Sequence, residues 1–440
     1  MANFDPSGSI KLRNYDTLSE QVYSGKLPNG LPVFVVPKRG FHKYYAFFAT
    51  DYGGADRRFK LGGKWIDTPA GVAHFLEHKM FDTENGNALT LLSENGASPN
   101  AYTSTDITAY HFMCTDMFRQ NFETLLSFVS VPYFTPESVE KEQGIIAQEI
   151  GMIEDDPDHC LYYGLLRSLF KHNPQRDSVA GTVESIAQIS AKTLYDCHKA
   201  FYHPSNMALC VAGDIDPKEI FDIAERILPK EPGEVPERDY GEKEAPEPET
   251  ARFTAEMEIS RPIFLAGCKT SPAPRGRESL RAELISAIAL DILAGHSSPL
   301  YIRLYGEGLV SSDFSASFES AAGTAYSVFG GESNEPERVY DEVKKEIARL
   351  SASGPDPALF GRIKKAALGS HIRMLNSFDA ICGGIVSGFF RGYDTFEATE
   401  LLSSMTIDDV TSFYHESLSP HNMAISIITP GNFTGDFNEH

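Results

Sequence analysis

Runs of apolar residues predict strands early in the chain and a series of helices after them. The segments LPVFVV at 31–36 and YYAFFATDY at 44–52 are rich in β-branched and aromatic residues, which is typical of strands. The stretch 100–114 alternates apolar and polar residues and predicts one longer strand. Helical periodicity then predicts three helices, at 118–129, 136–152 and 159–171. Because strands and helices are grouped rather than strictly alternating, the pattern indicates an α+β fold with helices covering one face of a sheet.

The two halves of the chain resemble each other near their ends. Residues 204–213 read PSNMALCVAG and residues 420–429 read PHNMAISIIT, so Pro, Asn, Met and Ala match in order. Each segment follows a helical stretch, TLYDCHKAFYH in the first half and DVTSFYHESLS in the second, and each becomes a short apolar strand. A coincidental similarity of two strand entries is the alternative. The matching lengths and the matching order of elements favour two copies of one domain.

A segment rich in Pro and Glu separates the two halves. Residues 229–251 are almost devoid of apolar side chains, which predicts an exposed linker. The sequence therefore predicts a domain at 1–228 that carries the candidate metal site described below, the linker at 229–251, and a homologous domain without that site at 252–440.

Composition limits the classes of partner. The chain has 440 residues, 42% of them hydrophobic, and a formal net charge of -22. Nucleic acid and anionic membranes both need basic surface, so neither is expected as a partner. The first thirty residues lack an apolar signal region, and no run of about 18 apolar residues predicts a membrane span. The six cysteines are scattered without a CxxC pair, which favours reduced thiols in a cytoplasmic protein.

The stretch GVAHFLEHKMF at 71–81 carries the main candidate for chemistry. It follows Asp67-Thr68-Pro69, and a Thr or Asp cap followed by Pro at the first helical position predicts that a helix begins there. On that helix His74 and His78 are four residues apart, so they share a face.

Two neutral imidazoles on one face suit zinc, which in catalytic sites takes a third protein ligand and keeps a fourth position open for water. Glu77 lies beside the two histidines and would deprotonate that water, an arrangement known as HxxEH. A surface helix with two histidines and no metal is the simpler interpretation of this stretch alone.

A second acidic motif follows about seventy residues later. Glu142 and Glu149 are seven residues apart, so they share a helix face. One of the two would supply the third ligand and the other would orient a histidine from behind. Such a pair alone is more often part of a solvated face. The apolar residues around it, Ile145, Ile146 and Ile150, favour a packed helix instead.

Together these motifs resemble the pitrilysin/insulinase family of zinc metallopeptidases, specifically its half-size bacterial members related to processing peptidases. The matching segments are AHFLEH at 73–78, EKEQGIIAQEI at 140–150, NAYTS at 100–104 and HPSNMALCVAGD at 203–214. The resemblance implies two homologous α/β-roll domains that form half of a clamshell. It implies Zn²⁺ as cofactor, bound by His74, His78 and Glu149, with Glu77 as general base and Glu142 supporting a ligand.

The resemblance also implies how peptide binds. Asn100, Ala101 and Tyr102 match an edge strand on which the family adds an extended peptide as a further strand, a mode that needs unpaired backbone groups. The resemblance implies that the clamshell encloses a chamber for the peptide. The negative charge of the chain suggests that this chamber prefers basic peptides.

One region of the second half departs from the family pattern. Active members usually carry an Arg and a Tyr in a stretch like SSRLYxxLRExxGLAY, whereas residues 297–317 read SSPLYIRLYGEGLVSSDFSAS. Tyr305 takes the place of the Arg, and Ser311 or Ser312 that of the Tyr, while Arg303 is two positions away. The loss of an oxyanion donor costs about 10²–10³ in rate. Some members of this family divide these parts between a zinc-bearing chain and a metal-free partner, so the resemblance implies a heterodimer whose homologous partner supplies Arg and Tyr. A homodimer that uses Arg303 is the second option.

The sequence thus predicts a zinc endopeptidase that acts on oligopeptides or on a small unfolded precursor peptide as the catalytic subunit of a dimer. The alternative is a peptide-binding or scaffold subunit with little turnover of its own. Retention of the complete HxxEH motif together with both glutamates favours the enzyme.

Overall fold

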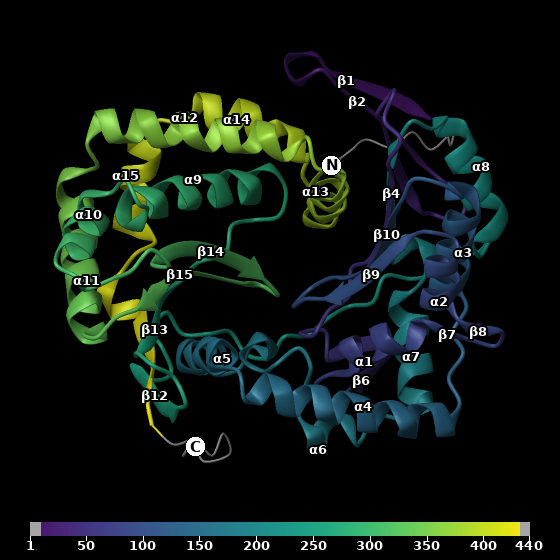
Figure 1. Ribbon diagram of the computed structural model, residues 1–440, viewed down its shortest axis with the longest axis horizontal. Coiled ribbons are helices and arrows are strands. Elements are labelled where there is room, and N and C mark those ends of the chain that lie inside the picture. Colours follow the sequence, from purple (N-terminus) through teal and green to yellow (C-terminus); the bar gives the residue numbers. More distant parts are fainter. Residues whose placement is uncertain (1–9, 432–440) are drawn as a thin grey trace. The chain divides into compact units, whose positions relative to one another are not determined.

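The computed structural model describes residues 10–431 and separates into two compact units (Figure 1). Within these residues the first unit comprises 10–150, Ser178–Tyr240 and Ile372–Phe396, and the second comprises Gly151–Asp177, Gly241–His371 and 397–431. Each unit contains one main sheet and the helices that pack on it, which confirms the predicted α+β class.

The first unit is built on a seven-stranded sheet with strand order β1-β2-β3-β11-β4-β10-β9. Its strands are β1 (Lys11–Tyr15), β2 (Glu20–Lys26), β3 (Pro32–Pro37), β4 (Tyr44–Thr50), β9 (Ser98–Thr103), β10 (Thr108–Cys114) and β11 (Met207–Gly213). Two small hairpins, β5 (Arg58–Leu61) with β6 (Lys64–Asp67) and β7 (Asp82–Thr83) with β8 (Gly86–Asn87), lie outside it. Its helices are α1 (Val72–Met80), α2 (Ala88–Glu94), α3 (Phe118–Ser130), α4 (Pro136–Glu154), α6 (Val183–Ile186), α7 (Ala191–Phe201), α8 (Pro217–Ile227) and α13 (Phe378–Arg391).

The second unit repeats this plan on a five-stranded sheet with order β12-β16-β13-β15-β14. Its strands are β12 (Arg252–Met257), β13 (Ile263–Thr270), β14 (Ser315–Ala321), β15 (Thr324–Glu332) and β16 (Met423–Pro430). Its helices are α5 (Pro157–Leu169), α9 (Arg277–Ala294), α10 (Pro299–Gly306), α11 (Pro336–Ser353), α12 (Pro357–Met374), α14 (Ala398–Ser404) and α15 (Ile407–Glu416).

The predicted internal repeat is visible in the pairing of the strands. β11 lies between β3, to which it is parallel, and β4, to which it is antiparallel. β16 lies in the same way between β12 and β13. The two PxNMA segments form a short 3₁₀ turn at the entry of β11 and of β16. The repeat therefore holds for topology as well as for sequence.

The two repeats exchange one helix each, which the contiguous division at 1–228 and 252–440 did not anticipate. α5 and α13 are the third helices after β10 and β15, respectively. α5 packs on β12, β13 and β16 of the second unit, whereas α13 packs on β4 and β11 of the first unit. In Figure 1 α13 is drawn in yellow-green, the colour of the late part of the chain, whereas β4, on which it packs, is drawn in the purple of the early part. Periodicity identifies the apolar face of a helix but not the sheet that this face will cover.

Residues 229–251 are mostly exposed, but they do not form a free tether. The guanidinium of Arg238 lies 3.0 Å from the buried carboxylate of Asp56, and the Tyr240 hydroxyl donates to the same carboxylate. Further on, the carboxylate of Glu244 accepts hydrogen bonds from the backbone amides of residues 171–173. The segment is thus attached to the first unit before Tyr240 and to the second unit after it.

The predicted elements are confirmed, with one exception in the strands. The strands at 31–36 and 44–52 and the three helices appear within a few residues of their expected bounds. The stretch 100–114 is not one strand but the hairpin β9–β10. Its turn is closed by a hydrogen bond from the amide of Ser104 to the carbonyl of Ile107. Ser and Asp side chains favour such turns, and this signal outweighs the alternation of the flanking residues.

One helical stretch, Arg277–Gly306, is long and apolar enough by composition to cross a membrane. It consists of α9 and α10, and 56% of its most apolar window is buried. α9 packs on β14, α14 and α15. We interpret the stretch as a pair of core helices of the second unit.

Candidate metal centre

Helix α1 places the candidate ligands and begins later than the sequence predicted. Its first residue is Val72 and its N-cap is Gly71, whereas Pro69 lies outside the helix. Gly71 has φ of +91°, and a Cβ at this position would lie 2.5 Å from the carbonyl oxygen of Ala180. A close backbone contact therefore fixes the start of the helix, and it requires glycine.

The apolar side of α1 fixes the direction in which its polar side chains point. Phe75, Leu76 and Met80 are fully buried and hold the helix against the first unit. His74 and His78 lie side by side with their ring centroids 4.6 Å apart. The helix thus presents both imidazoles on one face, as the spacing predicts.

Glu149 of α4 completes a group of three candidate ligands. Its Oε1 lies 3.6 Å from Nε2 of His74, and its Oε2 lies 3.5 Å from Nε2 of His78. One candidate ligand atom from each of the three residues lies within 4.8 Å of the others. Zinc bonds of about 2.0–2.1 Å in a tetrahedron hold ligand atoms about 3.4 Å apart. The donor set and its spacing therefore fit a zinc ion.

Glu142 lies behind this group rather than in it. Its Oε1 is 3.1 Å from Nδ1 of His78, the ring nitrogen that faces away from Glu149. The buried ammonium of Lys79 is paired with Asp82 and lies 4.0 Å from the other oxygen of Glu142. The structure thus places Glu149 at the two Nε2 atoms and Glu142 at Nδ1 of His78, a difference in position that their spacing on the helix leaves open. On α4, Ile146 and Ile150 are buried, whereas Ile145 is 45% exposed and does not contribute to the packed face.

The surroundings shift the pKa values of the two histidines in opposite directions. Burial, with His78 nearby, lowers the pKa of His74 to about 4, so its imidazole is neutral at physiological pH. Burial also acts to lower the pKa of His78, but the carboxylates of Glu142, Glu77 and Glu149 outweigh it, and that pKa is raised. A neutral imidazole is the form that binds a metal.

Glu77 is buried beside this group and is held by a residue that sequence reasoning missed. Thr103, at the end of β9, donates a hydrogen bond of 2.7 Å from Oγ1 to Oε2 of Glu77. Burial raises the pKa of Glu77, and the Thr103 hydrogen bond opposes this. The available signal was the position of Thr103 in the NAYTS segment, where strand alternation places it on the same face as Ala101.

The segment Asn100–Tyr102 lies on the exposed edge of the seven-stranded sheet. β9 is the last strand of the sheet and, among residues 10–431, pairs with β10 alone. The amide of Ala101 is bonded by the side-chain oxygen of Asn100 at 2.9 Å, so it is not used in the β9–β10 ladder. β9 also packs against α1. An unpaired strand edge therefore adjoins the helix that carries both histidines and Glu77.

The residues considered as substitutes for the missing Arg and Tyr all lie in the second unit. The guanidinium of Arg303 on α10 is engaged by Glu342 at 2.6 Å and by Glu307 at 3.6 Å. Tyr305 is 55% exposed and stacks on Tyr301. The hydroxyl of Ser311 donates to Asp313 in the loop after α10. Arg303 thus forms ion pairs with two carboxylates of its own unit.

These features define a candidate metal site with an HxxEH motif on a duplicated α+β fold, and comparisons with known proteins assign the family of the chain. The family model described as "Insulinase (Peptidase family M16)" matches residues 63–183, and "Peptidase M16 inactive domain" matches residues 188–367. The "Uncharacterized zinc protease YmfH" of Bacillus subtilis (strain 168) is 37% identical over 432 residues, covering 96% of this chain and 99% of that protein. This chain belongs to the insulinase (M16) peptidase family.

Solved structures agree with this assignment. An M16-like peptidase from Alicyclobacillus acidocaldarius matches with a TM-score of 0.90 at 34% identity, covering 98% of this chain and 100% of that chain. Pitrilysin shares the fold with a TM-score of 0.78 at 16% identity, and this chain covers 47% of its length. A protein of Arabidopsis thaliana described as "Probable mitochondrial-processing peptidase subunit beta, mitochondrial" is 25% identical over 181 residues, 38% of this chain and 34% of that protein.

Proposed function

We propose that this chain is a zinc-dependent endopeptidase that hydrolyses peptide bonds in oligopeptides or in a small unfolded precursor peptide. One observation carries the proposal: the two oxygens of Glu149 face the Nε2 atoms of His74 and His78 at 3.6 and 3.5 Å, and buried Glu77 lies on the same helix. The description of relatives as zinc proteases supports the choice of metal.

In this proposal His74, His78 and Glu149 hold the zinc ion. Bound zinc would polarise the scissile carbonyl and lower the pKa of a water molecule. Glu77 would accept the proton of that water on its carboxylate and pass it to the leaving amine. Thr103 would fix the orientation of Glu77, and Glu142 would fix the ring of His78 through Nδ1.

The edge strand β9 would bind the substrate. An extended peptide would add to Asn100–Tyr102 as a further strand and exchange backbone hydrogen bonds with it. The Asn100 side chain occupies the amide of Ala101, so a peptide carbonyl would displace it. Strand addition favours unfolded peptides, because the backbone of a folded substrate is already paired.

We further propose that the chain works as the catalytic subunit of a dimer. Arg303 is engaged by Glu342 and Glu307, which supports an oxyanion donor from a homologous partner rather than from Arg303 itself. A related protein is described as the β subunit of a processing peptidase, which supports a division of labour. A homodimer would require Arg303 to leave both carboxylates.

The proposed compartment is the cytoplasm. All six cysteines are buried and unpaired, which is typical of proteins from reducing compartments.

The proposed function is tested with purified, zinc-loaded protein and a mixture of quenched fluorogenic peptides, with Glu77→Gln as the matched blank. Zinc content is measured on both proteins. We expect cleavage that Glu77→Gln abolishes while it retains zinc, because the variant keeps all three ligands.

Two other outcomes decide between the alternatives. Bound zinc without cleavage, followed by cleavage after addition of a homologous chain that carries the Arg and Tyr pair, would support the dimer. Bound zinc without cleavage under either condition would favour a peptide-binding subunit and refute the enzyme.

A further inference from the structure

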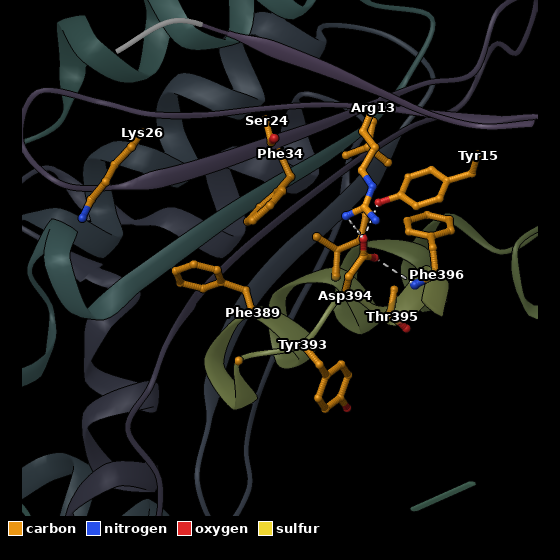
Figure 2. A pocket seen from close by; sticks show the side chains of 13 residues that line it. Arg13, Tyr15, Ser24, Lys26, Phe34, Phe389, Tyr393, Asp394, Thr395 and Phe396 are labelled. Carbon is orange, nitrogen blue, oxygen red and sulfur yellow. Dashed lines mark hydrogen bonds and ion pairs between the residues drawn. The ribbon is translucent and has the colours of Figure 1, made fainter. Parts of the chain in front are cut away.

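The first sheet contains two strands that have no counterpart in the second sheet, and they leave a cavity. β1 and β2 extend the first sheet beyond β3, whereas the second sheet ends at β12. α13 packs mainly on β4 and β11, and its Ile385 and Phe389 face the cavity beside the two added strands. After α13, residues 392–396 run beside β1, where Asp394 and Phe396 contact Tyr15. A cavity of about 280 Å³ remains between β1, β2, β3 and this returning segment (Figure 2).

The middle of the cavity is apolar. Phe34 from β3 and Phe389 from α13 meet with ring centroids 5.8 Å apart and planes tilted by 60°, which forms a concave corner rather than a flat stack. Val22 and Ile385 line the same region. Such a corner accommodates an aryl or acyl group without any rearrangement of the backbone.

One end of the cavity is closed by an internal network. Asp394 accepts from the hydroxyl of Tyr15 at 2.6 Å and pairs with the guanidinium of Arg13 at 2.5 Å. Its other oxygen accepts from the amide of Phe396, whose ring stacks on Tyr15. The negative charge of Asp394 is therefore neutralised within the protein, and it does not attract a cation into the cavity.

The opposite end carries a cation that is not neutralised. Figure 2 shows Lys26 at the far side of Phe34 from Asp394. Within the described residues the ammonium of Lys26 forms no ion pair, and the side chain of Ser24 on the same strand forms no hydrogen bond. The charged groups of the lining are Arg13, Lys26 and Asp394, so its formal charge is positive on a chain of net charge -22.

We propose that this cavity binds a small carboxylate with an apolar body, which lies against Phe34 and Phe389 while its carboxylate reaches Lys26. At about 30 Å³ per water molecule the volume corresponds to about nine waters, so the ligand has on the order of ten non-hydrogen atoms. A charge-assisted hydrogen bond to Lys26 supplies the selectivity for an anion. This site is separate from the proposed peptidase site and shares none of its residues.

The test uses the full-length holoprotein and two pairs of probes that differ in charge. The pairs are octanoate with 1-octanol and 3-phenylpropionate with 3-phenylpropan-1-ol. Isothermal titration calorimetry and ligand-observed NMR measure their binding. Lys26→Met removes the charge and keeps the length of the side chain, and Ser24→Leu fills the cavity. Lys43→Met is the matched control, because Lys43 is a lysine of the same unit that lies over Phe378, outside the cavity lining.

We expect saturable binding of at least one carboxylate, about tenfold weaker binding of its alcohol and of the carboxylate to Lys26→Met, and loss of binding in Ser24→Leu. Lys43→Met should bind like the unmodified protein. The proposal is overturned if neither carboxylate binds saturably, if the alcohols bind equally well, or if Lys43→Met weakens binding as much as Lys26→Met. Because the assay measures no peptide cleavage, a failed peptidase assay leaves its result unaffected.

Discussion

Thr103 donates a hydrogen bond of 2.7 Å to the carboxylate of Glu77, and so connects the edge strand β9 with the proposed general base on α1. The edge strand proposed to bind peptide and the proposed base are therefore in direct contact. Because Glu77 is only 8% exposed, water cannot readily replace the Thr103 hydroxyl as a hydrogen-bond donor to its carboxylate.

Replacement of Thr103 by Val, which keeps the shape and removes the hydroxyl, is expected to lower kcat about tenfold with little change in KM. The physical reason is that the base loses the hydrogen bond that holds its orientation, while the backbone of β9 remains available to peptide. Steady-state kinetics on a fluorogenic peptide measures both constants. Thr103→Ser should restore most of kcat, and zinc content should be unchanged in both variants. Full kcat in Thr103→Val would remove Thr103 from the proposed mechanism.

Glu142 is expected to contribute to zinc affinity through His78 without binding the ion. Its carboxylate lies 3.1 Å from Nδ1 of His78 and fixes the ring with Nε2 toward Glu149. Glu142→Leu should weaken zinc binding by about 10–100-fold, the usual cost of losing such a partner. Glu142→Gln should show a smaller loss, because the amide oxygen still accepts a hydrogen bond.

Competition with a chromophoric chelator measures these affinities. Glu140→Leu is the control, because Glu140 lies on the same helix and is exposed. Equal affinities for Glu142→Leu and Glu140→Leu would show that His78 needs no support from Glu142.

The sequence alone predicts that the candidate residues pair up on two helix faces, because these relationships are local. The spacing of His74 and His78 places them on one face of any helix, and the seven-residue spacing of Glu142 and Glu149 does the same on α4. Which glutamate faces the Nε2 atoms depends on how α4 packs against α1, so the resemblance to a family was needed to choose Glu149. Thr103 was missed because its role depends on a contact between elements 26 positions apart in the chain.

Tertiary packing also explains the parts of the fold that the sequence did not predict. The amphipathic pattern of α13 marks Ile381 and Ile385 as buried, but nothing local indicates that they pack on a sheet formed by the first half. In the structure both belong to a cluster with Phe47 and Tyr45 of β4. Likewise, the start of α1 is set by the approach of Gly71 to Ala180, more than a hundred residues later.

The helix exchange predicts that neither half of the chain folds stably alone. A fragment of residues 1–240 lacks α13 and would expose Phe47, Ala208 and Ala212 of the first sheet to water. Burial of apolar surface contributes about 25 cal/mol per Å², so loss of a whole covering helix removes several kcal/mol from the free energy of unfolding. Circular dichroism melts and NMR spectra of this fragment should show a poorly packed state.

Mixing the fragment 1–240 with the fragment 241–440 is the control, because the two together contain both exchanged helices. Recovery of a cooperative melt in the mixture would support the exchange. A well-dispersed NMR spectrum of 1–240 alone would show instead that this half is a self-sufficient domain.

Zinc is expected to stabilise the first unit against heat. A ligand that binds only the folded state adds about 2.7 kcal/mol to the free energy of unfolding at a concentration 100 times its Kd. Treatment with a chelator should therefore lower Tm, and re-addition of zinc should restore it. Glu149→Gln should melt at one temperature with or without zinc, because it loses the ligand that α4 contributes. Glu77→Gln should respond to zinc like the unmodified protein, and a response of Glu149→Gln of equal size would exclude Glu149 as a ligand.

His198 on α7 is expected to make stability depend on pH between about 4 and 7. The side chain is 8% exposed, and its ring stacks on Tyr202 with centroids 5.0 Å apart. Burial lowers the pKa of His198 to about 4, whereas an unfolded histidine titrates at about 6.5. The unfolded state therefore binds more protons in this window, so the contribution to stability is complete above pH 6.5 and is lost as the pH falls toward 4. Between pH 7 and pH 4 the loss amounts to roughly 2–3 kcal/mol.

Denaturant unfolding at several pH values in this window measures the effect, with chelator present so that zinc release does not contribute. His198→Gln cannot take up the proton, and its free energy of unfolding should fall less steeply with acid than that of the unmodified protein. His421→Gln is the matched control, because His421 is exposed to solvent. If His198→Gln and the unmodified protein lost stability in parallel, the acid sensitivity would come from other titrating groups, such as His74, rather than from His198.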